Sequence, residues 1–176
     1  DALNAGAQLF IEEVKEHDLA RWSVDLAVYT AGDQAQCLQQ FIGIEQIAGI
    51  SPMQASGLTP LGAAVGMALD NLEARKKSYR DNGVPYYQPW LVIISDGSPT
   101  DSWQTAAQRA RHMAENRKLV SLPIGVAGAA AEHDDLACFQ LSDCLIAAAG
   151  IGPPRHGGAG HHNSGHTLLA PRTLDG

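Results

Sequence analysis

The sequence has few cysteines, few basic residues and no long apolar run. Its three cysteines, Cys37, Cys138 and Cys144, form no Cys-x-x-Cys pair, which argues against a disulfide framework and a zinc knuckle. The 12 Lys and Arg against 19 Asp and Glu give a net charge of -7. The basic residues form no stripe of the kind that binds nucleic acid or an anionic membrane. No apolar run reaches the length of a membrane span, and no signal-peptide pattern opens the chain. We therefore expect a cytoplasmic protein with neither nucleic acid nor membrane as a partner.

A length of 176 residues with 45% apolar residues fits one globular domain. Residues 2–17 carry apolar side chains at the spacing of one helix face, and Leu3, Ala7, Phe10 and Val14 are expected to face the core. Short apolar or β-branched runs alternate with further helical patterns along the chain. They predict strands at 22–30, 34–43, 90–94 and 119–126, and helices at 61–81, with a solvated charged end, and 102–116.

This alternation predicts an α/β fold with a doubly wound, mostly parallel sheet over residues 1–149. The first two strands are separated by a turn signal and are expected to form a hairpin. The strand at 90–94 reads as buried on both faces, and Pro123 predicts an edge position or a bulge for the last strand. Residues 150–176 are rich in Gly, Pro and His without apolar periodicity, which predicts a disordered tail.

Polar side chains stand where predicted strands and helices meet their loops. Asp96 directly follows the buried strand at 90–94, at the edge where open α/β sheets collect ligands. A carboxylate there is costly to desolvate unless it is paired, hydrogen-bonded or bound to a cation, although it also serves as a turn or helix cap. Thr59 precedes Pro60 at a helix start, which is typical of an N-cap followed by a first-turn proline. Together, Thr59 and Asp96 suggest a site for an oxygen-seeking cation.

The stretches "GLTPLGAAVGMAL" and "RKKSYRDNGVPYYQPWLVIISDGSPTDSW" resemble the von Willebrand factor type A (VWA) domain, and more closely its bacterial tellurite-resistance-associated group. The resemblance covers about residues 1–140. It implies a Rossmann-like fold and a metal-ion-dependent adhesion site, in which Mg²⁺ or Mn²⁺ is held by oxygen ligands from three loops and an acidic side chain of a protein partner completes the coordination. Thr59 matches the second of these loops and Asp96 the third. The expected function is non-enzymatic protein interaction.

The chain departs from the family pattern at its start. The first ligand loop, Asp-x-Ser-x-Ser, is absent, and Asp1 comes too late in the pattern to replace it. Three oxygen ligands are then missing, so a cation held by Thr59 and Asp96 is expected to bind weakly or not at all. The family's first strand lies mid-sheet, and we expect its absence to leave two neighbouring strands without hydrogen-bond partners. We therefore interpret the chain as a VWA domain that is incomplete at its N-terminus.

Alternative interpretations involve other residues. Asp101, with Gln104 three positions later, has the spacing of a capping box, which predicts that Asp101 caps the helix that follows it. A metal-independent scaffold that uses the same surface is one alternative function, and a hydrolase built on Asp96, Ser98 and His112 is another. Four clustered histidines could also chelate a metal opportunistically, although compositional accident is the simpler interpretation. They are His156, His161, His162 and His166.

Overall fold

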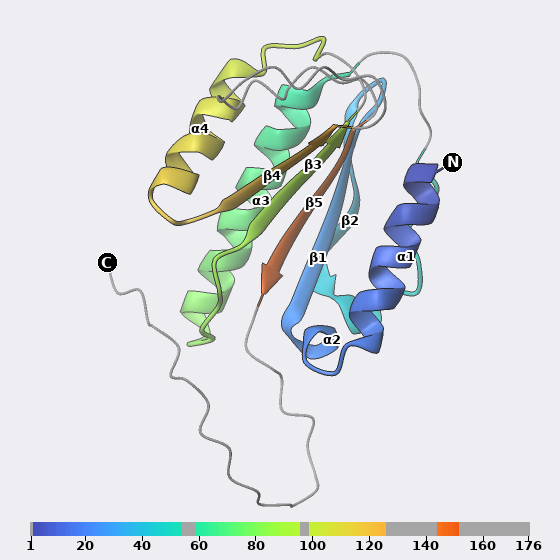
Figure 1. Ribbon diagram of the computed structural model, residues 1–176. Helices are drawn as coiled ribbons and strands as arrows, with labels where there is room; N and C mark the ends of the chain where they lie inside the picture. The colour runs from blue at the N-terminus through green and yellow to red at the C-terminus, as the bar shows by residue number, and fades with distance from the viewer. Residues whose placement is uncertain (1, 54–58, 96–98, 126–143, 152–176) are drawn as a thin grey trace, which may run out of the picture.

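The structure, a computed structural model, describes residues 2–53, 59–95, 99–125 and 144–151 (Figure 1). The helices are α1 (Ala2–Glu16), α2 (Ala20–Ser23), α3 (Leu61–Asp81) and α4 (Gln104–Glu115), with a short 3₁₀ helix at Ile44–Gln46. The strands are β1 (Val24–Ala31), β2 (Ala35–Gly43), β3 (Trp90–Ser95), β4 (Val120–Gly125) and β5 (Cys144–Ile151). The chain therefore forms a mixed α/β fold in the described ranges.

The described strands form one sheet in the order β2-β1-β5-β3-β4. β1 and β2 form the predicted antiparallel hairpin, which confirms that interpretation. β5 pairs antiparallel with both β1 and β3, so β1 and β3 run parallel to each other, and β4 runs parallel to β3. The prediction of a mostly parallel sheet is therefore wrong for the described strands, because β5 lies in reverse between two strands that share one direction.

β5 also changes the expectation for the middle of the sheet. Eight residues of β1 and five of β3 are in register with β5, so both strands have a partner on each side. The expectation that two middle strands lack hydrogen-bond partners is wrong for β1 and β3. β5 ends at Ile151, and residues 152–176, which hold most of the predicted tail, lie outside the described residues.

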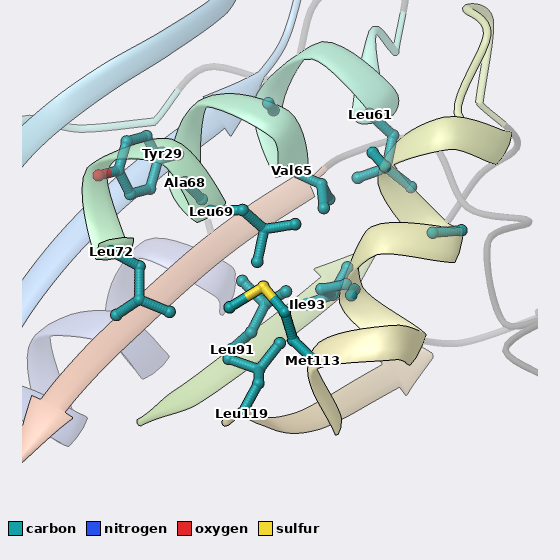
Figure 2. Packing of buried hydrophobic residues seen from close by; sticks show 14 of the residues in the cluster. Tyr29, Leu61, Val65, Ala68, Leu69, Leu72, Leu91, Ile93, Met113 and Leu119 are labelled. Carbon is teal, nitrogen blue, oxygen red and sulfur yellow. The ribbon is translucent and has the colours of Figure 1, made fainter. Parts of the chain in front are cut away.

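The larger core lies between the sheet and the helix pair α3 and α4 (Figure 2). Every second residue of β1 points to this side, and the apolar stripe of α3 packs against it, as the period of two in a strand and 3.6 in a helix requires. Leu61, Leu69 and Leu91 are fully buried in it. Burial of each such side chain contributes about 1.5–3 kcal/mol relative to exposure. This core fixes α3 on the sheet.

A second core lies on the opposite face of the sheet, under α1 (Figure 1). Leu26 and Val28 of β1, which alternate with the residues of the first core, are buried here. On α1, Ile11 is 1% exposed, whereas Phe10 is 47% exposed. The prediction that Phe10 faces the core is therefore wrong by one position. Helices thus cover both faces of β1.

The part of the sheet formed by β3 and β4 is less covered than the sequence predicts. Leu91 and Ile93 of β3 are buried, but Trp90, on the other face, is 45% exposed. The interpretation of β3 as buried on both faces is therefore wrong at Trp90. Among the described strands β4 lies at the edge of the sheet, which confirms within these ranges the edge position predicted from Pro123. Among the residues described, no helix is long and apolar enough to cross a membrane.

Candidate functional site

Thr59 lies in the loop directly ahead of α3 and is buried, with 2% of its surface exposed. Its N–H donates to Thr100 Oγ1 at 2.9 Å, and the Thr100 N–H donates to the Thr59 carbonyl oxygen at 2.9 Å. The prediction that Thr59 is the N-cap is wrong by one residue, because Pro60 occupies the N-cap position and α3 begins at Leu61. Thr59 therefore belongs to a loop that is hydrogen-bonded to the loop after β3.

Asp101 reaches the same place from the loop after β3. Its carboxylate oxygens accept hydrogen bonds from the backbone N–H groups of Gly62, at 2.9 Å, and Ala63, at 2.8 Å. Both amides belong to the first turn of α3, where N–H groups have no partner within the helix. The prediction that Asp101 caps α4 is therefore wrong. Trp103 is the N-cap of α4, and Asp101 caps α3 instead.

Gly62 allows these two segments to approach closely. A Cβ atom on Gly62 would lie 2.6 Å from the Cα of Trp103 and 2.9 Å from the carbonyl oxygen of Ser102. Both are backbone atoms, so a larger side chain would push α3 and this loop apart. We call the hydrogen-bonded unit formed by Thr59, Gly62, Ala63, Thr100 and Asp101 the loop clasp.

The loop clasp lies next in sequence to the predicted metal ligand Asp96. β3 ends at Ser95, and Asp96 lies outside the described residues, so its side chain is not placed. Thr100, the fourth residue after Asp96, is hydrogen-bonded to Thr59. The two loops in which the sequence predicts metal ligands are therefore joined through main-chain and side-chain hydrogen bonds at the carboxyl end of β3.

The described donors do not by themselves fit a divalent cation. Thr59 offers one hydroxyl from a buried position, and both oxygens of the Asp101 carboxylate in the loop clasp already accept hydrogen bonds from helix amides. Mg²⁺ prefers six oxygen ligands and usually takes one or two from carboxylates. The described ranges contain no group of three or more His, Cys, Asp or Glu residues able to hold a metal. A cation at this end would need a donor beyond the described set, such as Asp96.

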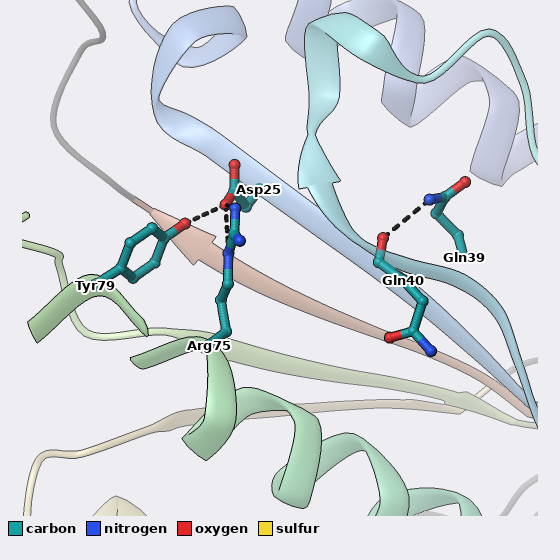
Figure 3. Close-up of polar contacts among 5 residues, drawn as sticks. All are labelled: Asp25, Gln39, Gln40, Arg75 and Tyr79. Atoms are coloured by element: carbon teal, nitrogen blue, oxygen red, sulfur yellow. Dashed lines mark hydrogen bonds and ion pairs between the residues drawn. The ribbon is translucent and has the colours of Figure 1, made fainter. Parts of the chain in front are cut away.

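A second polar cluster lies near the other end of α3 (Figure 3). Asp25, at the start of β1, is 4% exposed. Arg75 donates to its Oδ2 from Nε, at 2.9 Å, and from Nη2, and the Tyr79 hydroxyl donates to the same oxygen. The guanidinium of Arg75 also lies 4.9 Å from the centre of the Tyr79 ring. This cluster satisfies a buried carboxylate and joins α3 to β1.

Burial of the Tyr79 hydroxyl, and next its hydrogen bond to the negatively charged Asp25, raise the pKa of Tyr79 to about 12. The prediction that the charged end of α3 is solvated is therefore wrong at Tyr79 and at Lys76, which are both buried.

The sequence analysis did not predict this cluster of Asp25, Arg75 and Tyr79, although a signal was present. Asp25 falls on the same face of its strand as Ala27 and Tyr29, and a carboxylate on such a face needs a buried partner.

Other predicted site residues are dispersed or lie outside the described ranges. His112 is exposed in the last turn of α4 and contacts Asn116. It lies about 12 Å along the helix axis from Gln104, at the 1.5 Å rise per residue of an α-helix. Ser98 and the four histidines of the predicted chelating cluster are outside the described residues.

Comparisons of the chain with protein-family models, with curated proteins and with solved structures gave no match. The resemblance to the VWA domain therefore stays a prediction from the sequence.

Proposed function

We propose that this chain is a non-enzymatic protein-interaction module of the VWA type that binds an acidic side chain of a protein partner. The observation that carries this proposal is the loop clasp. It joins the loop ahead of α3 to the loop after β3, at the carboxyl end of the strand that precedes Asp96. Ligands of open α/β sheets bind outside the carboxyl ends of the strands. A binding surface built from these two loops would use that position.

The proposal includes a doubly wound, Rossmann-like arrangement. Two observations support it: cores lie on both faces of the sheet, and β1, β3 and β4 share one direction. The reversed β5 is the feature that such an arrangement does not explain. A cytoplasmic location is part of the same proposal and rests on the unpaired pattern of cysteines in the sequence.

The proposal includes a divalent cation. Mg²⁺ or Mn²⁺ would be held by the Thr59 hydroxyl and the Asp96 carboxylate, with an acidic group of the partner completing the shell. Because the described donors alone do not fit a divalent ion, its binding to the free chain is expected to be weak.

Equilibrium binding of short peptides tests the proposal. Peptides with one central Glu and matched peptides with Gln would be titrated in Mg²⁺, in Mn²⁺ and in chelator, with Thr59→Val as the variant. We expect the Glu peptide to bind and the Gln peptide not to bind. The Glu peptide should bind more tightly in Mg²⁺ or Mn²⁺ than in chelator, and Thr59→Val should bind it less tightly than the wild type. Binding that is equal in chelator would favour the metal-independent scaffold. Equal binding of the Glu and Gln peptides would contradict the acidic partner.

The hydrolase alternative has less support. His112, which it requires beside Asp96, is exposed in the last turn of α4, whereas the first turn of α4 follows the loop clasp. Turnover of p-nitrophenyl phosphate that disappears in Asp96→Ala would favour a hydrolase, and we expect no turnover.

A further inference from the structure

Four hydrogen bonds hold the loop clasp together, and none of them uses the Thr59 hydroxyl, which is the proposed metal ligand in this unit. Two join Thr59 to Thr100, and two join the Asp101 carboxylate to α3. The Asp101 bonds are charge-assisted and run to helix amides that otherwise lack a partner, which makes them stronger than neutral ones. The negative charge also lies at the positive end of the α3 dipole.

We propose that Asp101 is a positioning residue whose carboxylate, in place of a bound cation, holds the loop ahead of α3 against the loop after β3 and thereby fixes Thr59. Its functional meaning rests on the proposed function, since Thr59 matters to a partner only if these loops bind one. The positioning itself does not depend on any ligand.

The geometry explains why a short carboxylate suits this position. Each of the two oxygens meets a different amide, so Asn could keep only one acceptor and Ala none. The absence of a side chain on Gly62 lets the backbone of Trp103 approach α3 closely enough for Asp101 to reach the amides. The carboxylate and the glycine therefore act on the same contact from its two sides.

The consequence is a binding end that is assembled before any ligand arrives. A loop that is already ordered does not lose conformational freedom on binding, so less of the interaction energy is spent on ordering. Cations and chelators should then leave the clasp unchanged, whereas a change at Asp101 should open it. These two expectations separate the proposal from a metal-organised site.

Amide hydrogen exchange, followed by NMR on the whole chain, tests both expectations. The wild type would be measured in chelator and in Mg²⁺, beside Asp101→Ala and Asp101→Asn. Asp70→Asn is the matched control. Exposed Asp70 also joins α3 to another element, through an ion pair with Arg109 of α4, and its substitution removes the same negative charge. The exchange rates of Gly62, Ala63, Thr59 and Thr100 are the readout.

We expect the wild-type rates to agree in chelator and in Mg²⁺. In Asp101→Ala, the amides of Gly62 and Ala63 should exchange at least about tenfold faster, as expected for the loss of one hydrogen bond to a charged group each. Asp101→Asn should keep one of them protected, and Asp70→Asn should leave all four rates unchanged. Local acceleration at Thr59 would show that Asp101 positions it.

Faster exchange of the clasp amides in chelator than in Mg²⁺ would overturn the proposal, because a cation would then be the organiser. Unchanged rates in Asp101→Asn would also overturn it. The wild-type comparison needs no variant, so it can overturn the proposal even where a variant fails to fold. Failure of the proposed function looks different: the exchange pattern would be as expected, and the Glu peptide would not bind.

Discussion

The two ends of α3 are each joined to another element through an aspartate, but in opposite ways. At the N-terminal end, Asp101 binds backbone amides of the helix and meets no described basic side chain at hydrogen-bond distance. At the C-terminal end, buried Asp25 binds the side chains of Arg75 and Tyr79 (Figure 3). The first contact joins α3 to a loop, whereas the second joins it to a strand in the sheet.

The difference separates a contact that stabilises the whole domain from one that orders the loops of the candidate site. A buried ion pair leaves an uncompensated charge when one partner is removed, so the Asp25 cluster holds the helix on the sheet for the whole domain. A helix cap is worth less, and its loss is local. We therefore expect that substitutions in the loops at the N-terminal end of α3 can change those loops without unfolding the domain.

Asp25→Asn should be the most damaging single change at either end. It removes the charge that pairs with Arg75 and leaves the guanidinium without its counter-ion, at a cost of about 3–5 kcal/mol in the free energy of unfolding. Urea denaturation measures this cost. Asp70→Asn, which breaks an exposed ion pair between α3 and Arg109 of α4, should cost about 0–1 kcal/mol. Similar losses in the two variants would contradict the structural role given to Asp25.

Gly62→Ala and Gly66→Ala form a matched pair at the N-terminal end of α3. A Cβ on Gly62 would lie 2.6 Å from Trp103 Cα, whereas a Cβ on Gly66 would meet nothing within 4 Å. We expect Gly62→Ala to destabilise by about 1–3 kcal/mol through overpacking. Gly66→Ala should stabilise by about 0.5–1 kcal/mol through helix propensity. Equal effects of the two substitutions in thermal or urea unfolding would show that α3 and Trp103 are not in close contact.

Alkaline pH should act on the C-terminal end. The pKa of Tyr79 is about 12 in the folded chain, against about 10 for tyrosine in an unfolded chain. Above pH 10 the unfolded chain loses a proton that the folded chain keeps, so the stability contributed by Tyr79 is complete below pH 10 and is lost as pH rises toward 12. In Tyr79→Phe, the fall in unfolding free energy from pH 9.5 to 11.5 should be smaller by about 1.5–2 kcal/mol. Parallel curves for the two proteins would contradict the raised pKa.

The local patterns of the sequence predicted most of the individual elements. The period of the apolar residues indicated α1, α3 and α4, and the turn signals indicated the β1–β2 hairpin. What failed was the arrangement of strands over long range. β5 lies within a stretch that gave no strand pattern, and its place between β1 and β3 depends on pairings far apart in the sequence.

The candidate site was predicted in part, and for a physical reason. Thr59 was identified from a cap motif, and the structure joins its loop to the loop that follows Asp96. The role of Asp101 was missed, because a capping box describes bonds within one helix, whereas Asp101 caps a helix about 40 positions away in sequence. Local spacing cannot identify a cap donated across the fold.

A double-mutant cycle between Asp101→Ala and Gly62→Ala tests the central claim most directly, namely that the loop clasp is one unit. Unfolding free energies of the wild type, both single variants and the double variant would be measured in urea. We expect a coupling energy of at least about 0.5 kcal/mol, since both changes open the same contact. Asp101→Ala combined with Asp25→Asn, at the opposite end of α3, should be additive. Additivity of Asp101→Ala with Gly62→Ala, within about 0.3 kcal/mol, would contradict the account.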